Sequence, residues 1–261
     1  MTVIATYNIL HGYHKDLILN NIKILIEKDI DIICLQEADI SFEAILNNFF
    51  NSNDLNSWRI EYVHEGIAAN LAFVWNTSKV ELKGFEIIML PTIKPVFIQK
   101  IKGSASPLKR IALVGTFLVQ GKILRITNIH LAWEGGQSHR LKQLHFIKEK
   151  LNPDFFKGVD VIVGDFNTFG FLYSRLKQQK QVESLLHEYK NALPNLKWTC
   201  DISYTAPEDK WESVATFCRL FRIKLRTRLD YIFARNVKIT DAQMLDLSGS
   251  DHRPLLVTFK N

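Results

Sequence analysis

Runs of hydrophobic residues divide the chain into short segments typical of strands and helices. Residues 3–9 are mostly β-branched or apolar, and residues 15–28 repeat apolar positions at the spacing of one helix face. Residues 29–35 form another apolar run, which ends at Gln36 and Glu37. The first part of the chain therefore predicts a strand, a helix and a second strand.

The rest of the chain continues this mixture. Further strands are expected at 58–63, 70–75, 111–119, 122–131, 159–163, 229–234, 237–245 and 255–259, and further helices at 42–50 and 135–151. Gln120 and Gly121 separate two of these strands as in an antiparallel hairpin, whereas other strands are connected through helices. Such mixed connections predict an α/β sandwich of two packed mixed sheets with helices on the outer faces.

A single domain over residues 1–261 is the simplest organisation. No linker rich in proline, glycine or serine interrupts the pattern, and no internal repeat is visible. Hydrophobic residues make up 47% and charged residues 23%, as in globular proteins that bury a core. The chain shows neither a secretory signal nor an apolar window long enough for a transmembrane segment, and its three cysteines fit a reducing compartment. We expect a soluble cytoplasmic monomer.

The net charge of +6 and the pI near 9.1 favour anionic partners such as nucleic acid, phosphorylated metabolites or an acidic lipid surface. Arg222, Lys224, Arg226 and Arg228 alternate with other residues, so an extended chain would place these cations on one face with Asp230. This basic row is either a track for a phosphate backbone or a solvated edge that guards against aggregation. The sequence leaves both interpretations open.

Acidic, amide and histidine residues lie where the expected strands end or begin. They are Asn8, Glu37, His130, Asp165, Asn167, Asp230, Asp251 and His252. Charged groups rarely lie beside buried strands without a partner. If these strand ends converge, Glu37, Asp230 and Asp251 form an oxygen-rich pocket suited to Mg²⁺. Any one of the eight residues alone is more often a cap, a turn or a core residue, so only the set is informative.

Six segments in this order resemble the motifs of the endonuclease/exonuclease/phosphatase superfamily, which includes DNase I-like nucleases, deadenylases, sphingomyelinases and inositol polyphosphate 5-phosphatases. They are Tyr7-Asn8-Ile9, Leu35-Gln36-Glu37, Thr127-Asn128-Ile129-His130-Leu131, Gly164-Asp165-Phe166-Asn167, Arg228-Leu229-Asp230-Tyr231-Ile232 and Ser250-Asp251-His252. The resemblance covers nearly the whole chain. It implies a four-layer α/β/β/α fold with the active site at one edge of the sandwich.

The resemblance also implies metal-ligating and water-activating residues. Glu37 would bind a divalent metal with help from Asn8 and Asp251, with Mg²⁺ as the expected ion and Mn²⁺ as the alternative. Asp165 would orient or activate the attacking water. The metal would act as Lewis acid and template.

The remaining implied catalytic residues act on the phosphate. His130, Asn167 and His252 would stabilise the negative charge that builds up in the transition state. Asp230 would hold His252 in position. DNase I-like members pair the residue that matches His130 with an earlier glutamate, and Glu65 is the candidate here.

Two further features concern the substrate. Leu10 occupies a position where the DNA-repair branch usually has an aspartate, which weighs against an abasic-site nuclease. Arg110 begins a core-like strand at a position where the superfamily often places a basic residue near the phosphate. We take Arg110, Arg226 and Arg228 as the candidate substrate-binding residues.

These features favour a metal-dependent phosphodiesterase that acts on nucleic acid or nucleotides. One alternative is a phosphoesterase of inositol phosphates or of phospholipids, like a sphingomyelinase, but the sequence shows no evident amphipathic membrane helix. Another is a catalytically silent binding module on the same fold. Because every catalytic position has a chemically competent residue type, we favour an enzyme.

Overall fold

The computed structural model describes residues 1–64, 70–92, 109–169, 172–204 and 212–260. Within them, one six-stranded sheet contains β1 (Thr2–Asn8), β2 (Ile32–Gln36), β3 (Trp58–His64), β4 (Asn70–Asn76), β13 (Lys238–Met244) and β14 (Leu255–Lys260). The strand order of this first sheet is β13-β14-β1-β2-β4-β3. The N-terminal strand therefore lies between the last strand of the chain and β2.

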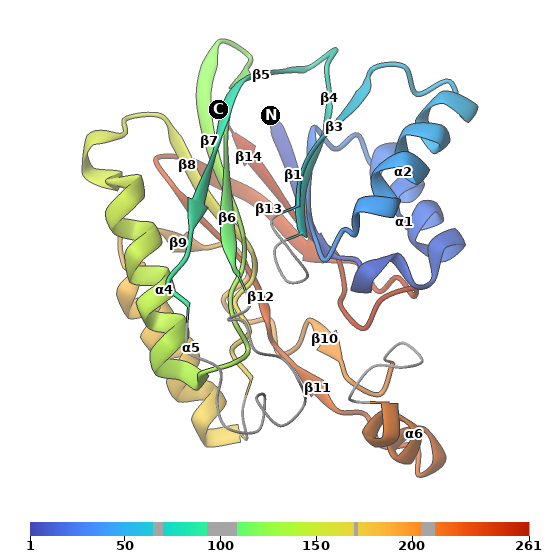
Figure 1. Ribbon diagram of the computed structural model, residues 1–261. Coiled ribbons are helices and arrows are strands. Elements are labelled where there is room, and N and C mark those ends of the chain that lie inside the picture. The colour runs from blue at the N-terminus through green and yellow to red at the C-terminus, as the bar shows by residue number, and fades with distance from the viewer. Residues whose placement is uncertain (65–69, 93–108, 170–171, 205–211, 261) are drawn as a thin grey trace.

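The second six-stranded sheet of the described residues comes from the middle of the chain. It contains β5 (Val80–Met89), β6 (Ile111–Val119), β7 (Lys122–His130), β8 (Val159–Asp165), β9 (Lys190–Asn191) and β12 (Asp230–Arg235). Its strand order is β5-β6-β7-β8-β12-β9. A two-stranded ribbon, β10 (Cys200–Asp201) with β11 (Arg226–Thr227), lies beyond the sandwich edge (Figure 1).

Helices cover the outer faces of both sheets, as Figure 1 shows. The first sheet is covered by α1 (Lys15–Glu27) and α2 (Ile40–Ser52), and the second by α4 (Gly136–Leu151) and α5 (Leu172–Leu185). The short helix α6 (Glu212–Leu220) projects beyond the ribbon, and the 3₁₀ turns η1 (Leu10–Gly12) and η2 (Pro153–Phe155) lie in loops. The expected four-layer α/β/β/α fold is confirmed. No described helix has the length and apolar character needed to cross a bilayer.

Side-chain alternation along the strands builds three apolar layers. In β4, Phe73 faces the core between the sheets, whereas its neighbours Ala72 and Val74 face the helices α1 and α2. Strands buried on both faces therefore appear in the sequence as continuous apolar runs. Asn128 of β7 makes polar contacts across this intersheet core, because its Oδ1 accepts from Gln36 Nε2 at 2.7 Å and its Nδ2 donates to Leu35 O at 2.9 Å. These hydrogen bonds fix how the two sheets are aligned.

The sheet topology brings many strand ends to one edge of the sandwich. β1 and β2 run parallel, as do β7 and β8, so each pair has its carboxyl ends together. β12 runs antiparallel to β8 and begins at this edge, where Asp230 lies opposite Asp165. Polar residues that are distant in sequence therefore meet here.

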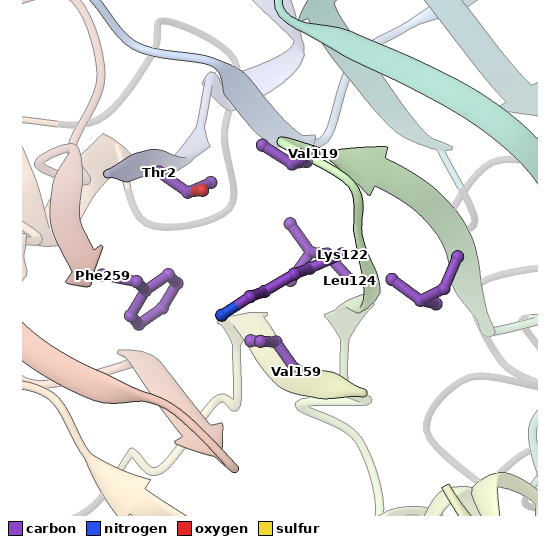
Figure 2. A pocket seen from close by; sticks show the side chains of 7 residues that line it. Thr2, Val119, Lys122, Leu124, Val159 and Phe259 are labelled. Carbon is purple, nitrogen blue, oxygen red and sulfur yellow. The ribbon is translucent and has the colours of Figure 1, made fainter. Parts of the chain in front are cut away.

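The opposite edge of the sandwich is closed. Figure 2 shows side chains there, among them Thr2, Val119, Lys122 and Phe259, around a cavity of about 10 Å³. This volume has room for roughly one water molecule. A cavity of this size is too small for a phosphoester.

Gly164 shows how closely the strands pack beneath that edge. Its φ is +126°, and a Cβ on Gly164 would lie 2.1 Å from the carbonyl oxygen of Ile129 in β7. Both backbones belong to buried central strands, so neither can move away. Gly164→Ala is expected to lower the free energy of unfolding by about 3 kcal/mol or more, measured by urea denaturation.

The matched control is Gly84→Ala in β5, where an added Cβ has no atom within 4 Å. This variant is expected to unfold at nearly the wild-type urea concentration. Equal stability of the two variants would contradict the packing described for Gly164.

Candidate active site

The carboxyl ends of β1 and β2 bring Asn8 and Glu37 together. Asn8 Nδ2 donates to Glu37 Oε1 at 3.1 Å and to Asp165 Oδ2 at 3.3 Å. Asn8 Oδ1 accepts a hydrogen bond from the backbone N–H of Leu10 at 3.1 Å, which orients its amide. Asn8 therefore connects carboxylates that come from the two different sheets.

Asp165 lies at the centre of the cluster, at the end of β8. Its Oδ1 accepts the backbone N–H of Asn167 at 2.8 Å. Its Oδ2 lies 3.6 Å from His130 Nε2 and 3.8 Å from His252 Nε2. Burial, together with the negative charges of Asp230 and Glu37, raises the pKa of Asp165 to about 7 against the opposing effect of His252.

His252 is held in its charged form. Its Nδ1 lies 2.8 Å from Asp230 Oδ2 at the start of β12. Burial alone would lower the pKa of His252, but the charges of Asp230 and Asp251 and the hydrogen bond to Asp230 outweigh this and raise that pKa well above its usual value. The side chain is therefore an imidazolium buried beside Asp165.

His130 has the opposite charge state. Burial lowers the pKa of His130 well below its usual value, and the positive charges of Arg110 and His252 lower it further. His130 Nε2 lies 3.6 Å from Glu37 Oε1. The expected partner Glu65 lies outside the described residues. These shifts favour a neutral His130 and a charged His252, whose Nε2 atoms both lie within 4 Å of Asp165 Oδ2.

A tight loop presents Asp251. Ser250 Oγ donates to the Asn8 backbone oxygen at 2.8 Å and lies 3.3 Å from Asp251 Oδ1, and Cys200 Sγ lies 3.8 Å from Asp251 Oδ2. Burial, joined by the charge of Glu37, raises the pKa of Asp251 to about 6. The structure therefore brings all eight predicted catalytic and metal-ligating residues to this edge.

The clustered carboxylates fit a divalent cation. Ligand atoms of Glu37, His130 and Asp165 lie within 4.8 Å of one another, and so do those of Asp165, Asp230 and His252. Burial is the main cause of the raised pKa values of Asp165 and Asp251, and the negative charges of Glu37 and Asp230 raise them further. A hard cation bound by the carboxylate oxygens would relieve this repulsion.

Arg110 lies beside this cluster, one residue before β6. It is buried, and its Nη2 lies 3.4 Å from Glu134 Oε2. Its Nε and Nη1 have no hydrogen-bond partner among the described residues. Since buried donors are nearly always paired, these two N–H groups are available to an anionic ligand.

The other two candidate arginines are already engaged. Arg228 is buried and lies 4.2 Å from the ring centroid of Tyr231, and it donates to the backbone oxygens of Pro194 and Leu196 at 3.3 Å each. Arg226 stacks 3.9 Å from the ring centroid of Trp198 and pairs with Asp201 at 3.1 Å. Both guanidinium groups hold the loops around the ribbon together.

The interpretation of residues 222–228 as one extended basic face is wrong. Only Arg226 and Thr227 are paired in a strand, and Arg222 follows α6 with a φ of 53°. Its backbone N–H bonds to Arg219 O at 3.2 Å, as in a helical turn. The alternation of charged and apolar residues therefore does not place these cations in one row.

The structure also brings in two residues that the sequence analysis did not identify. His11 Nε2 lies 3.2 Å from Glu37 Oε2, and His11 Nδ1 lies 3.0 Å from Asp39 Oδ1. Arg140 of α4 is buried, and its charge interacts with Asp165. The position of His11 three residues after Asn8 is the only signal that the sequence offers for either residue.

Solved structures share this architecture at low sequence identity. TDP2 of D. rerio, crystallised with a single-strand DNA product, is 17% identical with a TM-score of 0.72, covering 100% of this chain and 99% of its own. The human Nocturnin catalytic domain with bound sulfate is 17% identical with a TM-score of 0.66, covering 99% and 94%. A mannosyl-6-phosphatase of Bacteroides thetaiotaomicron VPI-5482 is 15% identical with a TM-score of 0.68, covering 100% of both chains.

Sequence comparison identifies the family directly. A search of curated protein sequences finds no significant match. By contrast, the model of the Endonuclease/Exonuclease/phosphatase family matches residues 5–252, which span all eight clustered residues. The chain therefore belongs to the Endonuclease/Exonuclease/phosphatase family.

Proposed function

We propose that this protein is a divalent-metal-dependent phosphodiesterase, with nucleic acid or nucleotides as its favoured substrates. The observation that carries the proposal is the position of Asp165, a buried carboxylate with a pKa of about 7 that lies beside a neutral and a charged histidine. A general base works best when its pKa is close to the working pH. The net charge of +6 and the DNA product bound to the TDP2 structure support a nucleic-acid substrate.

Asp165 accepts a proton from the attacking water in the proposed reaction. Its Oδ1 is held by the backbone N–H of Asn167, which leaves Oδ2 facing the two histidines. The Asn8 amide donates to the same Oδ2 and limits its motion. The carboxylate is thus preorganised rather than free to rotate.

His252, Asn167, Arg110 and His130 act on the phosphoryl group. His252 donates from Nε2 to a phosphoryl oxygen, since Asp230 already engages its Nδ1. Asn167 Nδ2 donates to Leu131 O at 2.8 Å, which leaves its second amide hydrogen for the phosphate. These donors, with the Arg110 N–H groups that have no partner in the described part of the chain, stabilise charge that develops in the transition state. Neutral His130 adds a hydrogen bond without adding charge.

Glu37, Asn8 and Asp251 would hold the divalent ion. When bound, Mg²⁺ or Mn²⁺ supplies Lewis-acid polarisation of a phosphoryl oxygen. His11 fixes the second oxygen of Glu37, and Ser250 fixes Asp251. Such supporting contacts keep metal ligands in position.

Turnover of a small chromogenic phosphodiester tests the proposal. Purified protein is expected to hydrolyse it with Mg²⁺ or Mn²⁺, to lose the activity with excess chelator, and to regain it when Mg²⁺ is returned. Activity that resists the chelator would contradict the metal requirement. A lack of turnover of DNA, RNA, nucleotides, inositol phosphates and sphingomyelin would favour the silent binding module instead.

A further inference from the structure

The chain exposes large apolar and basic side chains together at and after α6. The exposed apolar residues are Phe217, Leu220, Phe221, Ile223 and Leu225, with exposed fractions of 54%, 76%, 59%, 42% and 38%. The exposed basic residues are Arg219, Arg222 and Lys224. We call these eight residues the α6 surface. Contiguous apolar exposure of this kind marks an interaction site in soluble proteins.

Other residues of α6 are buried, so the exposed apolar side chains lie on one face of the helix. Ala215 and Cys218 are buried. Phe217 and Phe221, one turn apart, lie with their ring centroids at 4.6 Å and remain in solvent. The helix therefore buries its small residues and presents its large ones.

The chemistry of the α6 surface favours a lipid bilayer. The α6 surface contains three cations, Arg219, Arg222 and Lys224, and no acidic residue, which complements anionic headgroups. Leu220, Ile223 and Leu225 have no π face, so they cannot stack on the bases of a nucleic acid. A mixture of Phe, Leu, Lys and Arg is typical of segments that lie in the headgroup region.

The α6 surface and the active site are connected through the ribbon. Asp201 in β10 donates its backbone N–H to Asp251 O at 2.7 Å, and Cys200 forms a bridge with His252. In Figure 1, α6 projects on the side of the sandwich where β1 ends. A surface that contacts α6 therefore lies on the active-site side of the protein.

We propose that the α6 surface docks this protein on anionic phospholipid membranes. Phe217, Leu220 and Phe221 insert at the boundary of headgroups and acyl chains, while Arg219, Arg222 and Lys224 contact lipid phosphates. Long basic side chains reach the headgroups while their stems stay on apolar surface. Docking is independent of the proposed hydrolysis and does not require that the lipid be the substrate.

Vesicle flotation tests docking. Wild-type protein is expected to float with vesicles of phosphatidylcholine and phosphatidylserine, far less with phosphatidylcholine alone, and less as salt is raised. Neutralising Arg219, Arg222 and Lys224 to glutamine should lower the partition coefficient on anionic vesicles about a hundredfold, because each cation contributes roughly fivefold. Changing Phe217, Leu220 and Phe221 to serine should lower it by more than about tenfold on the same vesicles.

The matched control changes three exposed apolar residues elsewhere, Phe85, Ile87 and Met89 of β5, to serine. We expect this control to float like wild type. All three variants should keep the wild-type circular dichroism spectrum and wild-type turnover of a soluble chromogenic diester, which shows that the fold is intact. Asp165→Asn should float normally while losing turnover, so failure of docking and failure of hydrolysis are distinguishable.

Other outcomes overturn the proposal. Wild-type protein that stays unbound with phosphatidylserine vesicles, or a β5 control that loses as much binding as the α6 variant, would reject docking through α6. If the serine variant floats normally but loses single-stranded DNA binding, the surface serves nucleic acid. If that variant floats normally and converts a dimer to a monomer in light scattering, the surface joins two copies of the chain.

Discussion

Replacing Asp165 with asparagine is expected to lower phosphodiester turnover by about 10²–10⁴-fold, because the amide cannot accept the proton of the attacking water. The change keeps the size of the side chain and an oxygen that can accept the backbone N–H of Asn167. Turnover at saturating Mg²⁺ measures the loss. The thermal transition should remain near that of wild type, since no buried group becomes larger.

The control for this experiment is Asp154→Asn in η2, because the Asp154 side chain is 84% exposed and far from the cluster in the fold. It should retain wild-type turnover. If the Asp165→Asn protein is as active as this control, Asp165 has no role in the reaction.

Replacing Glu37 with glutamine is expected to weaken the apparent affinity for Mg²⁺ by about 10–100-fold or more, with partial recovery of turnover as Mg²⁺ is raised. Glutamine can still accept the hydrogen bond from Asn8, but it lacks the charge that attracts the ion. The affinity of each protein for Mg²⁺ is measured in two ways, by titrating Mg²⁺ in turnover assays and by calorimetric titration of Mg²⁺ binding.

Glu27→Gln at the end of α1 is the matched control, since this carboxylate is exposed and lies outside the cluster. Its Mg²⁺ dependence should equal that of wild type. If Glu37→Gln shows the same loss of turnover at every Mg²⁺ concentration, Glu37 is not a metal ligand.

The sequence predicted most strands and the residues of the cluster because polar residues follow the apolar runs where these strands end. β8 is an apolar run, interrupted by the buried Asp160, that stops at Gly164 and Asp165, and β7 stops at His130. In a sheet buried on both faces, a polar residue after such a run identifies where the strand reaches the edge. The fold and the family are confirmed, whereas the roles of individual residues, the single domain, the monomeric state and the compartment stay predictions.

Elements without that apolar signal were not predicted. β5 has mostly exposed residues between Glu81 and Glu86, and α5 is rich in Lys and Gln with few apolar residues. The segment after α6 has an alternating pattern that favours a strand, so the exposed apolar surface was not recognised. Sequence alone also cannot give the opposite charge states of His130 and His252, since these depend on burial and on charges brought from other strands.

The place of β1 between β14 and β2 has a consequence for synthesis on the ribosome. Asn8 and Glu37 emerge early, but Asp251 and His252 emerge only near the end of the 261-residue chain. Until β14 arrives, one edge of β1 lacks its hydrogen-bonding partner and the pocket lacks two of its residues. A growing chain therefore completes this cluster only after the segment that carries Asp251, His252 and β14 has been synthesised.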